Sequence, residues 1–128
     1  MNKQLKILVV DDEELTQDFL RFFLSKKFDV YTVGSVSAFY NIINNVDFDL
    51  IIMDVSLRDT KDGIQLTQEL KKTKKYKDVP IYVLSAFNTT RERESAHNAG
   101  ANNFLVKPFD WKSLMNLIES SLSTPTYN

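Results

Sequence analysis

Short apolar runs alternate with amphipathic segments along this chain. The apolar runs cover residues 5–10, 29–33, 49–53, 81–84 and 103–106. Several of them are almost continuously apolar, which is typical of parallel strands that are covered by helices on both faces. The pattern therefore predicts five buried strands.

The segments between these runs carry apolar residues at helical spacing. One stripe consists of Leu15, Phe19, Phe22 and Phe23. The segment "TTRERESAHNAG" is different, because its only apolar residues are Ala96 and Ala99, and we expect a weakly anchored, comparatively mobile helix there. Strand and helix alternate five times, which predicts an α/β fold with right-handed crossovers and an open, doubly wound parallel sheet.

Length and composition narrow the class of protein. The 128 residues suit one domain, expected over residues 1–122, with 123–128 as a flexible C-terminal tail. The net charge of -1 provides no global field to attract nucleic acid or an anionic membrane, and the absence of cysteine excludes disulfides and zinc–thiolate sites. No apolar run approaches the roughly 20 residues of a membrane helix, and a signal-peptide pattern is absent. We therefore expect a cytoplasmic domain that binds neither membrane nor nucleic acid directly.

Polar side chains follow four of the five apolar runs. They are Asp11 and Asp12, Asp54, Ser85 and Lys107. A carboxylate at the end of a buried strand is costly unless a neighbour compensates it. Because the carboxyl ends of parallel strands lie along one edge of a sheet, where ligands bind, these side chains predict a site.

The residue types in this set indicate phosphoryl chemistry. Three carboxylates with one lysine keep an excess of negative charge, which a hard cation neutralises, so we expect Mg²⁺, with Mn²⁺ as an alternative. A divalent cation, a lysine and a hydroxyl around one carboxylate are the groups that stabilise a transferring phosphoryl group. The carboxylate of Asp54 can itself be the nucleophile and form an aspartyl phosphate.

The runs "VVDDEE", "IIMDVSL", "VLSAF" and "AGANNFLVKPF" resemble the receiver domain of two-component response regulators of the chemotaxis-regulator type. The resemblance extends from about Leu5 to Leu122. It implies a flavodoxin-like sheet of order 2-1-3-4-5 flanked by five helices. It also implies that Asp54 accepts a phosphoryl group from a histidine kinase or a histidine phosphotransfer protein.

The resemblance assigns further roles to the site. Asp11, Asp12, Asp54 and the backbone carbonyl of Ser56 would hold the metal. Lys107 would pair with the phosphoryl group, and the bond to Pro108 that follows it is usually cis in the family.

The resemblance also implies a switch. The hydroxyl of Ser85 would move toward the phosphate and Phe104 would turn inward with it. The face made by the fourth helix, the fifth strand and the fifth helix would then change its downstream protein partner. Such a protein assists its own phosphorylation and dephosphorylation but is not a turnover enzyme.

Two features depart from the family pattern. Arg58 stands where most receivers carry a proline, and Gly63 follows one residue later than the usual glycine. This loop follows Asp54 and borders the predicted site, so the family pattern does not fix how accessible Asp54 is or how long a phosphoryl group would stay on it. Phe87 is apolar where a polar residue could position attacking water, and we expect slower self-dephosphorylation.

Other interpretations of the same residues stay open. Asp11 and Asp12 individually suit a helix N-terminus, whose dipole favours acids. A phosphatase that forms an aspartyl phosphate would need a second acid two residues after Asp54, where the chain has Ser56. The chain could also act as a phosphate-independent interaction module, or as the N-terminal receiver of a larger regulator.

Overall fold

The chain forms one parallel sheet flanked by helices. The computed structural model describes residues 4–122, so the expected tail at 123–128 lies outside the described residues. The strands are β1 (Lys6–Val10), β2 (Asp29–Val33), β3 (Leu50–Asp54), β4 (Ile81–Ser85) and β5 (Asn103–Val106). They pair in parallel in the order β2-β1-β3-β4-β5, which confirms the predicted doubly wound topology.

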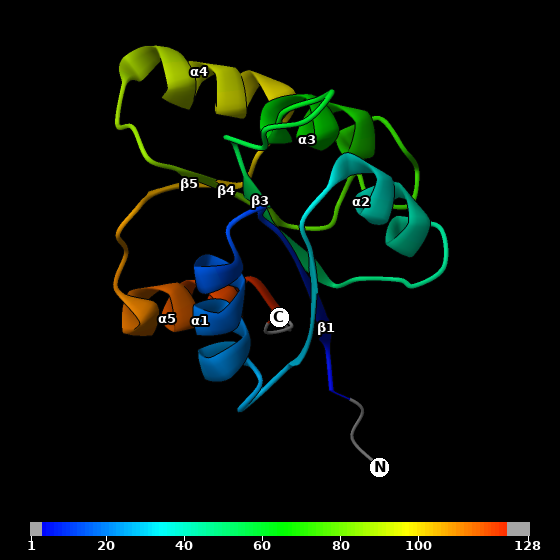
Figure 1. The fold of residues 1–128 in the computed structure, drawn as a ribbon, viewed down its shortest axis with the longest axis vertical. Coiled ribbons are helices and arrows are strands. Elements are labelled where there is room, and N and C mark those ends of the chain that lie inside the picture. Colours follow the sequence, from blue (N-terminus) through cyan, green and yellow to red (C-terminus); the bar gives the residue numbers. More distant parts are fainter. Residues whose placement is uncertain (1–3, 123–128) are drawn as a thin grey trace, which may run out of the picture.

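The five helices cover the two faces of the sheet (Figure 1). They are α1 (Glu14–Leu24), α2 (Val36–Ile43), α3 (Gly63–Lys71), α4 (Thr90–Ala99) and α5 (Trp111–Leu122). Helices α1 and α5 pack on one face, and α2, α3 and α4 lie over the other. None of the helices within residues 4–122 is long and apolar enough to cross a membrane.

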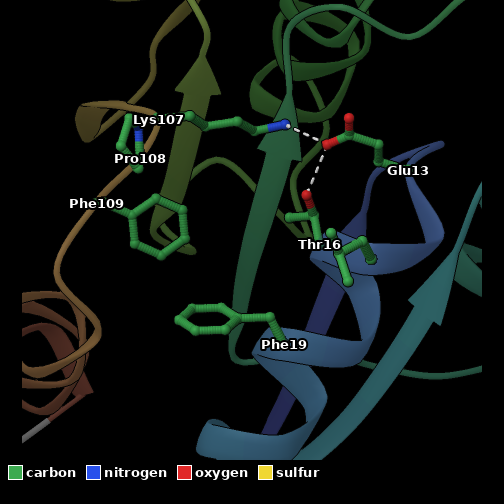
Figure 2. Close-up of a pocket in the computed structure, with 7 residues that line it drawn as sticks. Glu13, Thr16, Phe19, Lys107, Pro108 and Phe109 are labelled. Atoms are coloured by element: carbon green, nitrogen blue, oxygen red, sulfur yellow. Dashed lines mark hydrogen bonds and ion pairs between the residues drawn. The ribbon is translucent and has the colours of Figure 1, made fainter.

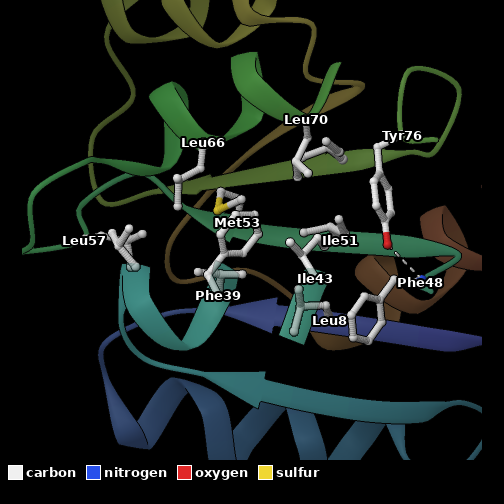
Figure 3. Packing of buried hydrophobic residues seen from close by; sticks show 13 residues of the cluster. Leu8, Phe39, Ile43, Phe48, Ile51, Met53, Leu57, Leu66, Leu70 and Tyr76 are labelled. Carbon is white, nitrogen blue, oxygen red and sulfur yellow. Dashed lines mark hydrogen bonds between the residues drawn. The ribbon is translucent and has the colours of Figure 1, made fainter. Parts of the chain in front are cut away.

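Strand β3 lies at the centre of the sheet, and all five of its residues are buried. Ile51 and Met53 face α2 and α3, where they pack against Phe39 and Leu66 (Figure 3). The alternate residues of β3 face α1 and α5. Burial on both faces explains the nearly continuous apolar run and supplies most of the driving force for folding. Asp54, the last residue of β3, is therefore held on a rigid element.

The apolar stripe that the sequence predicts on α1 does not form the buried face of this helix. Leu20 and Leu24 are the buried residues of this helix, whereas Leu15 and Phe22 are 80% and 65% exposed. Apolar residues occupy more of the circumference of α1 than the sheet can cover, so the helix turns Leu20 and Leu24 inward. Phe23 instead stacks on Trp111 of α5, with 4.6 Å between the ring centroids.

Helix α4 is anchored as weakly as its sequence predicts. Only Ala96 and Ala99 of this helix are buried. The helix ends at Gly100, whose φ of 101° is in the left-handed region that glycine adopts without strain. Because alanine buries little apolar area, α4 gains less from packing than the other helices do.

Candidate functional site

The carboxyl edge of the sheet brings the predicted acids together. Val10 pairs with Met53 in the register of β1 and β3, so the residues that follow, Asp11 and Asp54, lie side by side. One carboxylate oxygen from each of Asp11, Asp12 and Asp54 lies within 4.8 Å of the others. Asp11 and Asp54 are buried, and Asp12 is partly exposed. The acids therefore form one cluster that opens to solvent at Asp12.

Lys107 reaches this cluster from the end of β5. Its Nζ lies 3.0 Å from Oδ2 of Asp11, 3.5 Å from Oδ1 of Asp54 and 3.8 Å from Oε1 of Glu13. Its backbone N–H donates to the carbonyl of Ser85 at 2.8 Å, which continues the pairing of β4 and β5. The Lys107–Pro108 peptide bond is cis, as the sequence resemblance implied. Three of the predicted groups therefore lie in direct contact.

Burial sets the protonation of the central acid. It raises the pKa of Asp54 to about 6, and the neighbouring charge of Asp11 adds to this, while Lys107 acts in the opposite direction. Burial tends to lower the pKa of Lys107, but its hydrogen bond to Asp11 and the charges of Asp54 and Asp11 outweigh it, so the pKa is raised. Lys107 therefore stays protonated and positively charged, whereas burial disfavours the ionised form of Asp54.

The donor set fits a hard divalent cation. The cluster offers carboxylate oxygens from three residues, and its only direct lysine partner is Lys107 among the described residues, so negative charge is in excess. Mg²⁺ prefers such oxygen ligands. The backbone N–H of Ser56 donates to Oδ1 of Asp54 at 3.2 Å, while metal binding by the Ser56 carbonyl stays a prediction.

Arg58 contacts the cluster in a way that sequence reasoning missed. Its backbone N–H and its Nε both donate to Oδ2 of Asp12 at 3.1 Å. Burial acts to raise the pKa of Asp12, but the two hydrogen bonds and the charge of Arg58 outweigh it and lower the pKa. The sequence marked Arg58 only as a departure from a pattern, and no periodicity indicates which carboxylate a loop arginine contacts.

Gly63 keeps the loop after β3 close to the central acid. A Cβ atom at this position would lie 2.0 Å from the carbonyl oxygen of Asp54 and 2.7 Å from its carbonyl carbon. Gly63 also donates its backbone N–H to the carbonyl of Val55 at 3.1 Å. The longer loop therefore accommodates its additional residue before Gly63, and the glycine packs directly against the Asp54 backbone.

Among residues 4–122 no hydrogen bond joins Ser85 to Asp54, and Ser85 and Phe104 both contact side chains of α4. The hydroxyl of Ser85 hydrogen-bonds with Oε1 of Glu92, and its oxygen also lies 2.9 Å from the carbonyl oxygen of Phe87. The guanidinium of Arg93 lies 4.8 Å from the centroid of the Phe104 ring. Glu92 and Arg93 were not singled out from the sequence, because charged residues on a polar helix carry no signal of the side chains they contact.

A pocket adjoins the acid cluster on the side of α1 (Figure 2). It is lined by Leu15, Phe19 and Pro108, with Phe109 across from Phe19 at 6.2 Å between ring centroids. Lys107 and Glu13 also line the pocket, and the ion pair between them is drawn in Figure 2. The exposed apolar residues of α1 therefore border the opening that leads to Lys107.

Comparison with known proteins defines the class of protein. The family model for the response regulator receiver domain matches residues 7–119. The chain therefore belongs to the receiver domains of two-component response regulators.

Individual relatives agree with this assignment. The chain is 36% identical over 117 residues to "Protein PetR" of Rhodobacter capsulatus, covering 91% of this chain and 48% of PetR. Chemotaxis protein CheY4 of Vibrio cholerae superposes with a TM-score of 0.87 at 24% identity, covering 94% of this chain and all of CheY4, which bears on the fold alone. A putative response regulator from Chloroflexus aurantiacus superposes with a TM-score of 0.85 at 28% identity, over 95% of this chain and 100% of that one. The chain spans about half the length of the first curated relatives it matches.

Proposed function

We propose that this domain is a phosphorylation-activated switch in which Asp54 accepts a phosphoryl group. The observation that carries the proposal is the contact of a buried, strand-end carboxylate with Lys107 inside a cluster of three carboxylates. Membership in the receiver family supports the same role.

The carboxyl edge of the sheet provides the protein groups that this reaction needs on the receiver side. An oxygen of ionised Asp54 attacks the phosphorus of a phosphohistidine, the new O–P bond forms as the P–N bond breaks, and the imidazole leaves with its electron pair. Asp11, Asp12, Asp54 and the carbonyl of Ser56 would hold Mg²⁺ or Mn²⁺, which supplies positive charge for the phosphoryl oxygens. Lys107 binds a phosphoryl oxygen with the ammonium group that now contacts Asp11 and Asp54.

The phosphoryl group then biases a conformational equilibrium. It adds about -1.5 to -2 charges and three acceptor oxygens next to Asp54. The hydroxyl of Ser85 leaves Glu92 to donate to one of these oxygens, and Phe104 turns into the space that opens. Helix α4, which is anchored by two alanines, responds together with β5 and α5.

The proposed partners follow from this role. A histidine kinase or a histidine phosphotransfer protein supplies the phosphoryl group, and a downstream protein reads the face of α4, β5 and α5. The family supports a cytoplasmic location for this exchange and a role as a switch rather than a turnover enzyme. Slow self-dephosphorylation stays a prediction; Phe87, on which it depends, is 63% exposed.

A second candidate is an interaction module that takes no phosphate. The contact of Arg58 with Asp12 favours it, because a cation of the protein already occupies a carboxylate of the site. This candidate predicts that the domain binds its partner regardless of phosphodonor.

Intact mass after incubation with acetyl phosphate and Mg²⁺ separates the two candidates. A switch gains the mass of one phosphoryl group, and the gain is lost in Asp54→Asn and in the presence of EDTA. Asp110→Asn, at an exposed aspartate that bonds only to the start of α5, is the matched control and should be phosphorylated normally. The absence of any adduct in the wild-type protein would favour the interaction module.

A further inference from the structure

Arg58 competes with the metal ion for Asp12. We propose that the guanidinium of Arg58 is a displaceable counterion that lowers the affinity of this domain for divalent cations and has to leave Asp12 when a cation binds. The inference rests on the proposed function, because it assumes that the three-carboxylate cluster is a metal site.

The contact is made to a single oxygen of Asp12. Oδ2 accepts both the backbone N–H and the Nε–H of Arg58, each at 3.1 Å. An oxygen that already accepts two hydrogen bonds presents little free lone-pair density to a cation. A proline at position 58 would provide neither donor, so the competition comes from this residue.

The charge of Arg58 also changes the field of the cluster. Asp11, Asp12 and Asp54 contribute three negative charges and Lys107 one positive charge, which leaves a net charge of 1 − 3 = −2. The ion pair with Arg58 reduces this to −1. Because Asp12 is the exposed member of the cluster, the guanidinium lies where an entering cation would meet it.

The backbone of Arg58 has more contacts that fix its position than the Arg58 side chain does. Leu57 is buried, and the backbone N–H of Arg58 is bonded, so the main chain at this position is fixed. The Arg58 side chain is 82% exposed, and within residues 4–122 its only ion pair is with Asp12. A solvent-exposed ion pair is weak, so the guanidinium can move into water while the loop stays in place.

Calorimetric titration of the phosphate-free, 128-residue chain with MgCl₂ tests the competition. Arg58→Ala should lower the Kd for Mg²⁺ about three- to tenfold, because it removes the side-chain donor and the repelling charge and keeps only the backbone N–H. Arg91→Ala removes the same charge from an exposed position in the first turn of α4 and should change the Kd less than twofold. Equal affinities of Arg58→Ala and the wild-type protein, or equal gains in both variants, would overturn the proposal.

A second readout follows the guanidinium itself. The Nε–H resonance of Arg58 is one of four from arginine in this chain and is assigned by its loss in Arg58→Ala. It should shift from its carboxylate-bound position as Mg²⁺ is added, with a midpoint equal to the calorimetric Kd, while the Arg21 resonance stays unchanged. A resonance that does not move at saturating Mg²⁺ would overturn the proposal and leave the proposed function intact. No Mg²⁺ binding by either protein would contradict both.

Discussion

Asp54 is held in a charged state that the fold disfavours, and this has a measurable effect on stability. Its pKa in the folded protein is about 6, mainly because the carboxyl is buried and secondly because Asp11 is beside it. An unfolded aspartate has a pKa of about 3.9, so the native state binds an extra proton between about pH 4 and pH 6. The contribution of Asp54 to stability therefore falls as the pH rises through this window.

Asp54→Asn should consequently stabilise the metal-free protein at neutral pH. We expect a gain of about 1–2 kcal/mol at pH 7.5, less than the shift alone implies because asparagine loses the charge-assisted contact with Lys107. The gain should shrink toward pH 4, where wild-type Asp54 is protonated. Urea unfolding in EDTA at both pH values measures the difference. A variant that is less stable than the wild-type protein at pH 7.5 would contradict the assignment.

A substitution of Gly63, again a single residue, tests how closely the loop after β3 packs against Asp54. In Gly63→Ala the added Cβ would lie 2.0 Å from the carbonyl oxygen of Asp54, and the backbone has to move. We expect a loss of about 3 kcal/mol in the free energy of unfolding. Gly34→Ala is the matched control, because the closest atom to its Cβ would be the side-chain Nε2 of Gln17 at 3.1 Å, with the Asp11 carbonyl oxygen at an ordinary 3.5 Å, and it should cost less than about 1 kcal/mol. Equal losses in the two variants, measured by urea unfolding, would show that the close approach is not restrictive.

At the scale of the element, side chains of α4 contact both Ser85 and Phe104, the two residues that the sequence resemblance assigned to the switch. Adjacent residues of this helix make the contacts: Glu92 binds the Ser85 hydroxyl, and Arg93 lies over the Phe104 ring. Because Glu92 contacts Ser85 at the end of β4, it is partly desolvated, and this burial raises the pKa of its carboxyl. The unphosphorylated arrangement is thus stabilised by side chains of a helix whose two buried residues are both alanine.

Removal of the Glu92 carboxyl should shift this equilibrium toward the activated state. In Glu92→Ala the Ser85 hydroxyl has no Glu92 carboxylate to leave. The free-energy cost of reaching the activated state is therefore smaller when a phosphate analogue binds. We expect the apparent affinity for fluoroberyllate in saturating Mg²⁺ to rise about threefold. Glu94→Ala, at an exposed position of the same helix, is the control and should match the wild-type protein. If Glu92→Ala binds the analogue more weakly than the control does, Glu92 does not restrain Ser85.

At the scale of the whole molecule, most of the fold could be predicted from the sequence. Strands buried on both faces leave continuous apolar runs, and β3 and β4 show them clearly. The topology places the carboxyl ends of β1, β3 and β5 at one edge, so the sequence could predict that Asp11, Asp54 and Lys107 lie together. The prediction of the apolar stripe of α1 failed because α1 has apolar residues on several sides, and their spacing alone does not specify which side faces the sheet.

The remaining parts of the site depend on side-chain conformation. Arg58, Glu92 and Arg93 are charged residues on a loop and a polar helix, where the default sequence interpretation is a solvated surface. Their partners are 46, 7 and 11 residues away in the chain, and no local pattern specifies such pairs.

The central claim is that a phosphoryl group on Asp54 rearranges α4 and β5. The most direct test is the amide ¹H–¹⁵N NMR spectrum before and after addition of fluoroberyllate and Mg²⁺. We predict large shifts for Ser85, Phe104 and the residues of α4, little change in β2, and none of these shifts in Asp54→Asn. Shifts confined to the loops around Asp54, with Ser85, Phe104 and α4 unchanged, would contradict the account.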